Sequence, residues 1–444
     1  MACSTRLRKL GLIECYHSAR HYLGLDSCVV SAAQYTTQDG LWLTKTILFP
    51  ALRSLIDTHA ALGLRLDGNE TTDDIYLVRL PSVDLSRIVE FSGKDNLQHA
   101  LESQLLRGFE TQADLPLYRV EVLADNTVLF AFHHTIADGM SGLAFHLSLF
   151  KALQQQSGVD ASPLVQVPSA LALLPPVDNK TELKPSLSTI GRMAYNAYAP
   201  AAWTKAHSAW TGPTSPLTPP DLTTSVRLLA FCGNEVAALC AVARKHEATL
   251  TSAVYVLALT VLSGMVGRDS GKRYTRIGAG VAVSLREIAG VPNDVLCDYP
   301  TIVYDYPRVL HEFSWPAASR FAAVLQTQKR KGRETIGMLE HLDGKVGDYL
   351  KLHIGEKRET GFTVSNVGRV KVPAVEGKWA IHRTMFAQCD VVTGAAFMIN
   401  ITGDPTGALN VTFTWGAAYV EAEFVEEFIA KFQTGIQKLA DQDV

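Results

Sequence analysis

Two adjacent histidines end an apolar run in the stretch LFAFHHTIADGMSG, residues 129–142. Asp138 stands four residues after His134, and Gly139 follows it. With 13 histidines in 444 residues, chance alone would place an aspartate four residues after a histidine about once. The additional His133 and the glycine make the full HHxxxDG pattern far more specific. The pattern therefore predicts a chemical role.

General-base catalysis is the chemistry that suits these residues. A neutral imidazole has an unperturbed pKa of about 6.5, so it can remove a hydroxyl or amine proton near neutral pH. A histidine leaving a buried strand has a rigidly held ring, and the following turn can bring the aspartate back towards it. Gly139 lets the backbone bend where a side chain would block the turn or a substrate. The alternative is that His134 is an ordinary hydrogen-bonded core histidine.

The HHxxxDG motif resembles that of the CoA-dependent acyltransferase superfamily, which includes chloramphenicol acetyltransferase, plant BAHD acyltransferases, carnitine acyltransferases and peptide-synthetase condensation domains. The resemblance implies that His134 deprotonates an acceptor, which attacks a thioester directly without an acyl-enzyme. It also implies that Asp138 holds the loop through an ion pair with an arginine, and that His133 is packed structurally. His134, Asp138 and Gly139 are thus the expected catalytic set, with His133 in support.

Other stretches resemble the fungal alcohol acetyltransferase family within that superfamily. They are LRKLGLIECYHSARHYLG and CVVSAAQY near the N-terminus, PLYRVEVL before the histidines and SGLAFHLSLF after them. FTVSNVG, residues 362–368, resembles the second-domain strand that borders the active-site tunnel. The plant-type DFGWG motif is absent from the sequence, and TFTWG at 412–416 is only faintly similar to it.

Supporting residues are expected in the second half of the chain. Arg286, in VAVSLRE, is the expected partner of Asp138, with Arg20 as a rival and a surface arginine as the alternative. A buried arginine–carboxylate pair is costly to break, which suits a scaffold. Ser365 and Asn366 are candidates for oxyanion donors or for the substrate pocket, as is the Gly139 N–H for the oxyanion. Their alternative is ordinary strand-end hydrogen bonding.

Weaker candidates complete the set. The basic run QKRKGR, residues 328–333, either contacts nucleotide phosphates or is a solvated helix end. Tyr299 and Trp415 either line the acceptor pocket or are core residues. No spacing supports a metal site. No role is assigned to five further histidines, namely His21, His146, His246, His341 and His382.

Length and composition limit the class of protein. A chain of 444 residues exceeds what one core normally covers. A formal net charge of −3 and the lack of a basic tail argue against a nucleic-acid or anionic-membrane partner. Seven scattered cysteines predict reduced thiols, and the N-terminus lacks the apolar core of a signal peptide, so a cytoplasmic location is expected. The uncharged stretch 249–267 predicts a buried core helix rather than a membrane span, because threonine, serine and glycine dilute it.

Apolar periodicity predicts an α/β protein. A hairpin is expected to turn at 124–126, and its second arm, 128–132, is apolar on both faces and so belongs inside a sheet. Strands and helices restart at SVRLLAF after a proline-rich stretch. Together with the resemblance, this predicts two chloramphenicol-acetyltransferase-like α/β sandwich subdomains with mixed sheets and an active-site tunnel between them. The expected divisions are residues 1–180, a crossover at 181–222, and residues 223–444.

These features predict an O-acyltransferase. It would move an acetyl or short acyl group from acyl-CoA to the hydroxyl of a small hydrophobic alcohol of fungal secondary metabolism. It would act as a monomer with acetyl-CoA as cosubstrate and without a metal or bound prosthetic group. Carrier-protein-dependent condensation, and cyclisation or hydrolysis of a specialised metabolite, are the enzymatic alternatives. A catalytically inactive binding subunit is the third, although the complete HHxxxDG motif argues against it.

Overall fold

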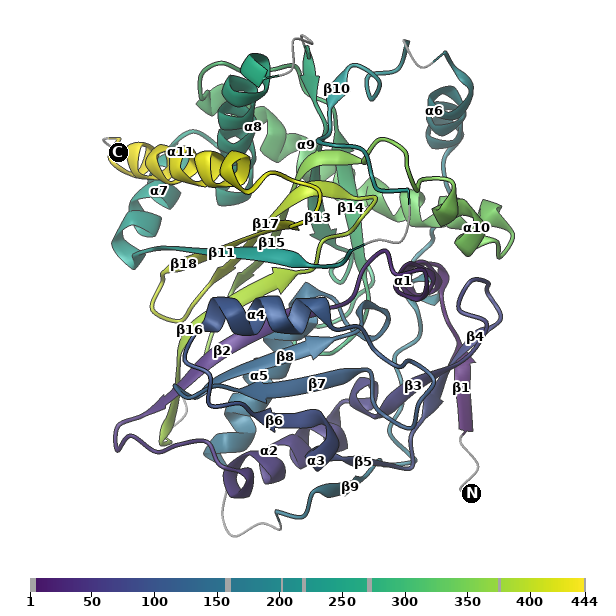
Figure 1. Ribbon diagram of the computed structural model, residues 1–444, viewed down its shortest axis with the longest axis vertical. Coiled ribbons are helices and arrows are strands. Elements are labelled where there is room, and N and C mark those ends of the chain that lie inside the picture. Colours follow the sequence, from purple (N-terminus) through teal and green to yellow (C-terminus); the bar gives the residue numbers. More distant parts are fainter. Residues whose placement is uncertain are drawn as a thin grey trace.

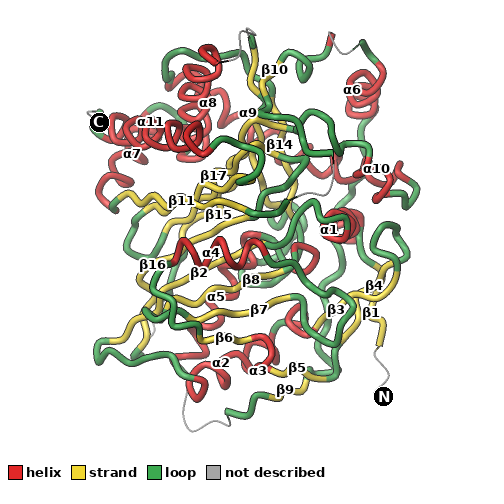
Figure 2. Tube along the Cα trace, viewed as in Figure 1, coloured by secondary structure: helices red, strands yellow, loops and turns green. Residues whose placement is uncertain are grey.

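The computed structural model describes residues 5–155, 161–200, 203–217, 221–269, 274–373 and 377–442. Two mixed sheets, one of five strands and one of six, lie at the centres of two stacked halves (Figure 1). Strands run through the middle of each half, with helices packed around them (Figure 2). The predicted α/β class with mixed sheets is confirmed.

The first half is built on the five-stranded sheet. Its strands, in spatial order, are β16 (Trp379–Gln388), β2 (Val29–Thr37), β8 (Thr127–Phe132), β7 (Tyr118–Val122) and β6 (Val89–Phe91). Helices α2 (Lys45–Thr58) and α5 (Gly139–Gln154) pack on one face, and α4 (Leu97–Leu106) packs on the other. Since β8 is central and buried along its whole length, the segment that leads to the two histidines is held firmly.

The predicted hairpin forms between β7 and β8. Asn126 lies in its turn with φ of 61°, a region that asparagine tolerates better than most residues. The Asn126 side chain accepts the N–H of Leu43 at 2.8 Å and donates to the carbonyl of Leu41 at 2.8 Å. The turn is therefore tied to the loop that follows β2.

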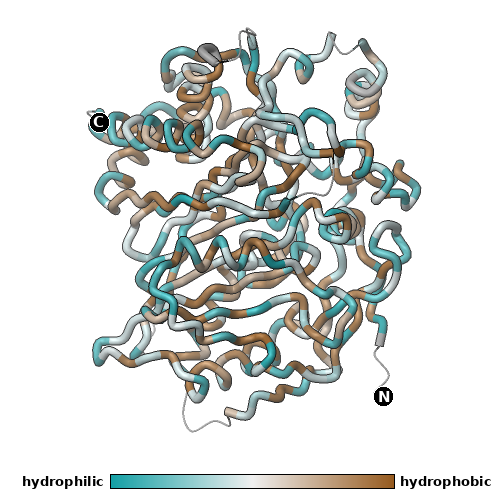
Figure 3. The backbone as a smooth tube through the Cα atoms, viewed as in Figure 1, coloured by the Kyte–Doolittle hydropathy of each residue, from teal (hydrophilic) through white to brown (hydrophobic). Residues whose placement is uncertain are grey.

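The second half is built on the six-stranded sheet. Its strands, in spatial order, are β11 (Thr224–Phe231), β18 (Leu409–Gly416), β17 (Ala395–Gly403), β15 (Thr360–Arg369), β13 (Ala279–Ser284) and β14 (Pro300–Asp305). The helices of its hydrophobic core are α7 (Gly233–Lys245), α8 (Leu250–Asp269), α9 (Trp315–Gly337) and α11 (Ala422–Ala440). Hydrophobic positions follow the strands of both sheets (Figure 3).

Helix α8 covers the uncharged stretch for which a core helix is predicted. Its residues from Ala253 to Leu259 are buried in the core of the second half. Within the described residues, no single helix is long and apolar enough to cross a membrane. Helices α7 and α8 meet the length and hydropathy of a span only when taken together, and they are bent by 93° where they meet.

The two faces of the six-stranded sheet differ in chemistry. Phe362 and Val364 of β15 belong to the helix-covered core. The intervening β15 residues, and alternate residues of β17 and β18, carry hydroxyl or amide groups that are also buried. Two of these groups meet β16: Gln388 Nε2 donates to Asn400 Oδ1 at 2.9 Å, and the hydroxyls of Thr384 and Thr402 lie 3.4 Å apart. The halves therefore meet across polar side chains.

Strand β16 joins the two halves. It follows β15 in the chain, yet it pairs along its whole length with β2 of the first sheet. A strand that follows residue 223 in the sequence is thus part of the first sheet. The division into residues 1–180, 181–222 and 223–444 stays a prediction.

Shorter elements surround the sheets. The strands are β1 (Thr5–Lys9), β4 (Ile75–Arg79), β3 (Leu64–Gly68), β5 (Ser82–Asp84), β9 (Leu164–Gln166), β10 (Ala209–Trp210) and β12 (Arg276–Ile277), and the helices are α1 (Leu12–Tyr22), α3 (Leu85–Ile88), α6 (Leu187–Tyr198) and α10 (Val346–Lys351). The start of α1 is fixed because the Glu14 carboxylate accepts the Gly11 N–H at 2.7 Å. This helix packs against the segment that follows β8.

Candidate active site

The two histidines of the motif have different surroundings. His134 opens a short 3₁₀ helix, η2 (His134–Ile136), directly after β8. The His133 ring, on a residue only 1% exposed, accepts the N–H of Thr135 at its Nδ1 and lies 4.4 Å from the His21 ring. The His134 side chain keeps 15% of its surface exposed. The His133 imidazole is thus buried, whereas the His134 imidazole is partly accessible.

A buried carboxylate binds the His134 ring. His134 Nδ1 lies 3.1 Å from Asp298 Oδ1, and His17 Nδ1 lies 2.7 Å from Asp298 Oδ2. The Asp298 side chain is 0% exposed, and the two imidazole rings lie 3.9 Å apart. An ionised carboxylate only accepts hydrogen bonds, so each Nδ1 donates, and in the neutral form of each ring the lone pair is then on Nε2. Unprotonated Nε2 is the form of His134 that can act as a base.

Burial governs the charges of this cluster. It lowers the pKa of His17 well below its usual range, and the nearby His134 lowers it further. Burial also raises the pKa of Asp298, against the opposing effects of the hydrogen bond from His134 and of the charges of Arg20 and Arg286. His17 is therefore neutral near pH 7, and it gives Asp298 a hydrogen bond without a second positive charge.

Neither His17 nor Asp298 is among the residues that the sequence predicts. A usable signal existed for the first, because His17 and His21 are four residues apart in a predicted helix and so share a face. These two rings contact His134 and His133 respectively. Asp298 gives no such signal, since it is 164 residues from His134 and no motif surrounds it.

Asp138 and Arg286 form a buried ion pair. Arg286 Nη2 lies 2.7 Å from Asp138 Oδ1, its Nε lies 3.2 Å from Oδ2, and the side chains are 1% and 3% exposed. Burial alone would lower the pKa of Arg286, but the Asp138 charge raises it above the ordinary arginine value. Asp138 Oδ1 also accepts the N–H of Ser141 at 2.9 Å, which caps α5. The pair therefore ties the start of α5 to the second half.

Gly139 lies where three elements meet. A Cβ at this position would lie 2.7 Å from Val367 Cγ1 and 2.9 Å from Phe386 Cζ. Val367 belongs to β15 and Phe386 to β16. Because its φ is not positive, the glycine is needed here for close approach, not for an unusual backbone conformation.

Gly139→Ala is expected to lower kcat at least tenfold and to reduce stability by about 1–3 kcal/mol, since the added methyl overpacks the start of α5. Activity assays and thermal unfolding check both effects. Gly264→Ala is the matched control, because an added Cβ there meets nothing within 4 Å. That variant, in helix α8, should keep wild-type activity and gain slightly in stability. Wild-type kcat and stability in Gly139→Ala would show that the close approach is not needed.

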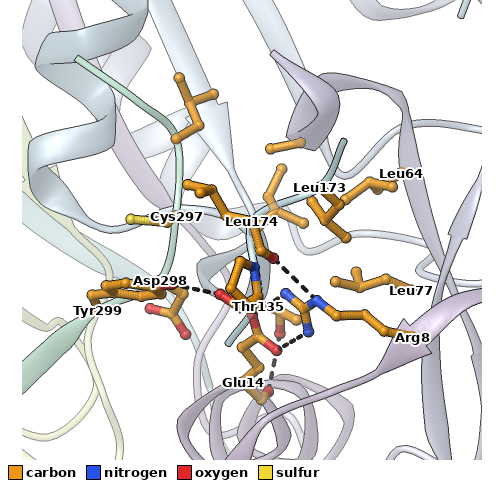
Figure 4. Close-up of a pocket in the computed structure, with 14 residues that line it drawn as sticks. Arg8, Glu14, Leu64, Leu77, Thr135, Leu173, Leu174, Cys297, Asp298 and Tyr299 are labelled. Atoms are coloured by element: carbon orange, nitrogen blue, oxygen red, sulfur yellow. Dashed lines mark hydrogen bonds and ion pairs between the residues drawn. The ribbon is translucent and has the colours of Figure 1, made fainter. Parts of the chain in front are cut away.

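Two pockets lie beside the His134–Asp298 pair. The first, here called the histidine pocket, spans about 250 Å³, a volume that includes open solvent, and has His134 in its wall. The second, the aliphatic pocket, spans about 270 Å³, again including open solvent, and has Asp298 in its wall (Figure 4). The histidine pocket is lined by Arg20, Asp26, Ser27, Cys28, Val29, His134, Gln388, Cys389 and Val391.

The aliphatic pocket combines apolar walls with one ion pair. Leu64, Leu77, Leu173 and Leu174 contribute to its wall, as Figure 4 shows. Across from them, the two terminal guanidinium nitrogens of Arg8, Nη1 and Nη2, bind Glu14 at 2.7 and 2.8 Å. The pocket is therefore apolar on one side and charged on the other.

The side chains of His17, His134 and Asp298 are also of the kinds that hold a metal ion. Among the described residues, His17, His134 and Asp298 place one potential ligand atom each within 4.8 Å of one another. Imidazole and carboxylate are ligands that Zn²⁺ accepts. The two hydrogen bonds to Asp298 already account for this grouping.

A family model described as alcohol acetyltransferase matches residues 9–272, more than half of the chain. The chain belongs to the alcohol acetyltransferase family. This confirms the resemblance seen in the sequence and makes the protein an acyltransferase. The matched segment includes the whole HHxxxDG motif.

Curated relatives match nearly the whole length of the chain. The probable alcohol acetyltransferase crmB of Aspergillus fumigatus is 23% identical, and the match covers 94% of this chain and 96% of the relative. The probable alcohol acetyltransferase FCK4 of Fusarium pseudograminearum is 24% identical, with coverages of 95% and 92%.

Solved structures show the same fold. The TRI3 trichothecene 15-O-acetyltransferase of Fusarium sporotrichioides has a TM-score of 0.71 at 14% identity, covering 98% of this chain and 95% of that one. The condensation domain of the monacolin K polyketide synthase MokA has a TM-score of 0.64 at 11% identity, covering 98% of each chain. At these identities the likeness establishes the fold and no more.

The two predicted oxyanion candidates, Ser365 and Asn366, have different surroundings. Ser365 is buried in β15, on the same face of the strand as Val367, which reaches Gly139. Asn366 instead donates to Thr251 Oγ1 at 3.0 Å and accepts the Gly368 N–H at 2.9 Å. Neither Ser365 nor Asn366 lines the two pockets described above. The Asn366 amide is thus engaged with α8 and the strand end.

Most of the weaker candidates have structural partners. Arg20, the alternative arginine partner considered for Asp138, pairs with Asp26. Trp415 belongs to the core of the second half. Tyr299 is buried and its hydroxyl donates to the carbonyl of Pro175, and it also forms part of the wall of the aliphatic pocket (Figure 4). In the basic run on α9, Lys329 binds Glu287.

Proposed function

We propose that this acetyltransferase moves an acetyl or short acyl group from acyl-CoA to the hydroxyl of a small hydrophobic alcohol, with His134 as the general base. The observation that carries the proposal is the state of the His134 ring. Its Nδ1 is bound to buried Asp298, while the side chain keeps 15% of its surface exposed in the wall of the histidine pocket. Such a ring has one nitrogen held and the other available for a substrate proton.

The reaction follows from that arrangement. His134 Nε2 accepts the hydroxyl proton as the alcohol oxygen attacks the thioester carbonyl. A C–O bond forms and gives a tetrahedral oxyanion, which collapses as the C–S bond breaks. The CoA thiolate then takes the proton back from His134, so the enzyme returns to its starting state. Asp298 stabilises the imidazolium that exists between the two proton transfers, as the aspartate of a catalytic triad does.

The remaining predicted residues have supporting roles in this proposal. The Asp138–Arg286 pair fixes the start of α5, and Gly139 keeps that start close to β15 and β16. The backbone N–H of Gly139 and the Ser365 hydroxyl are the proposed oxyanion donors.

Incubation of the protein with acetyl-CoA and a panel of apolar alcohols tests the proposal. Release of free CoA thiol should depend on the alcohol, and mass spectrometry should find the acetate ester. No ester with any alcohol, together with product formation from a phosphopantetheine-loaded carrier protein, would favour condensation instead. Cyclisation or hydrolysis would show as turnover without an acyl acceptor. An inactive binding subunit would give none of these products. The monomeric state, the cytoplasmic location and the place in secondary metabolism stay predictions.

A further inference from the structure

We propose that His17 is a positioning residue for acyl transfer: it fixes the Asp298 carboxylate so that this carboxylate can hold His134. The inference rests on the proposed function, in which His134 is the base. His17 comes from α1, His134 from η2 and Asp298 from the loop before β14. The three side chains therefore form one unit built from three distant segments of the chain.

The first argument is the distribution of donors around Asp298. Each carboxylate oxygen has one imidazole donor, and the bond from His17, at 2.7 Å, is shorter than the bond from His134, at 3.1 Å. In the part of the chain that the structure describes, no other hydrogen bond to this side chain is present. A fully enclosed carboxylate needs its hydrogen bonds to stay ionised. Without His17, one oxygen would have no donor, and the carboxylate could turn or take up a proton.

The second argument is the rigidity of His17 itself. Its side chain is 6% exposed and comes from the middle of α1, a helix of 11 residues. Tyr16, its neighbour on the helix, has its ring 5.9 Å from the His17 ring. His134, in contrast, has an exposed edge and belongs to a helix of only 3 residues. The rigidly held His17 ring can therefore fix the Asp298 carboxylate, which in turn orients the less constrained His134 ring.

His17 contacts the site in two separable ways. Its N–H binds Asp298, and its ring lies 3.9 Å from the His134 ring at an angle of 37°. The proposal assigns the catalytic effect to the N–H. If packing of the ring were what mattered, any flat side chain of similar size would serve.

Two variants of His17 separate these contributions. His17→Asn places an amide N–H near the position of Nδ1 but has no ring, whereas His17→Phe keeps a ring but has no donor. We expect His17→Asn to keep kcat within about threefold of wild type and His17→Phe to lose at least tenfold, with KM changed less than about twofold in both. Thermal unfolding of both variants shows whether they are folded under the assay conditions.

A double-mutant cycle tests whether His17 acts through Asp298. Asp298→Asn should lower kcat strongly by itself, and His17→Phe should cause no further loss in that background. Independent, multiplicative losses would contradict the proposal. If His17→Phe is not stable, His17→Leu provides the donor-free variant for the same cycle.

His21 supplies the matched control. It lies one turn later on α1 and contacts His133, and its Nε2 accepts the Phe109 N–H at 3.0 Å. His21→Phe should leave kcat unchanged even if it lowers the unfolding temperature. Equal losses in His17→Asn and His17→Phe would overturn the positioning role in favour of packing. Wild-type kcat in His17→Phe would overturn it too, while the absence of ester formation by the wild-type protein would refute the proposed function itself.

Discussion

His134→Ala is expected to lower kcat by roughly 100- to 10,000-fold, the range that a general base contributes. The reason is that no other group takes the place of the Nε2 that this variant loses. The fold should persist, because the His134 side chain is at the edge of a pocket and is not part of the hydrophobic core of the first half. Free-thiol release with acetyl-CoA and an accepted alcohol measures the loss, and thermal unfolding measures the stability.

The specificity of this effect can be tested in two ways. Added imidazole should restore part of the activity of His134→Ala, because the vacated space lies in the wall of the histidine pocket. His207→Ala, at an exposed histidine of the crossover, should behave as wild type. A rate near that of wild type in His134→Ala would remove the base from the mechanism.

Asp138→Asn is expected to destabilise the protein by about 3–5 kcal/mol, because it leaves the charge of Arg286 buried without its partner. Activity should fall as well, since the start of α5 would no longer be tied to the second half. Chemical denaturation and the yield of folded protein measure the first effect. Assays on the folded fraction measure the second.

The paired variant Asp138→Leu with Arg286→Met provides the comparison. Replacing a buried ion pair by apolar side chains removes both charges, so the double variant should be more stable than Asp138→Asn alone. Wild-type stability in Asp138→Asn would mean that the ion pair does not support the fold.

The sequence predicts best what is local. The hairpin at 124–126, the buried strand β8 and the core helix α8 each follow from a pattern within about 20 residues, and all three are present. The HHxxxDG motif is local too: Asp138 is both the cap of α5 and four residues from His134. Local patterns are sufficient here because strand burial, turn chemistry and helix capping depend on neighbours in the chain.

Arrangements between distant segments are harder to predict. Nothing near Asp298 indicates that its carboxylate meets two imidazoles from the first half, because the contact exists only once the halves have assembled. Strand β16 was not expected, and its pairing with β2 has no signature in either segment. The pairing of Arg286 with Asp138, in contrast, was expected from the family resemblance and not from spacing. Single-sequence patterns do not report which strands become neighbours when the strands are far apart in the chain.

The pairing of β2 with β16 has a consequence for folding of the protein during its synthesis. About 350 residues separate the two strands, so at ribosomal speed β2 waits roughly 20–70 s for its neighbour. During that time one edge of β2 pairs with β8, but the edge that later binds β16 is unpaired, and a second nascent chain can add a strand to it. A chaperone that shields this edge should raise the yield of folded enzyme. A fragment that ends before residue 379 should aggregate, and a separately supplied fragment carrying β16 should rescue it.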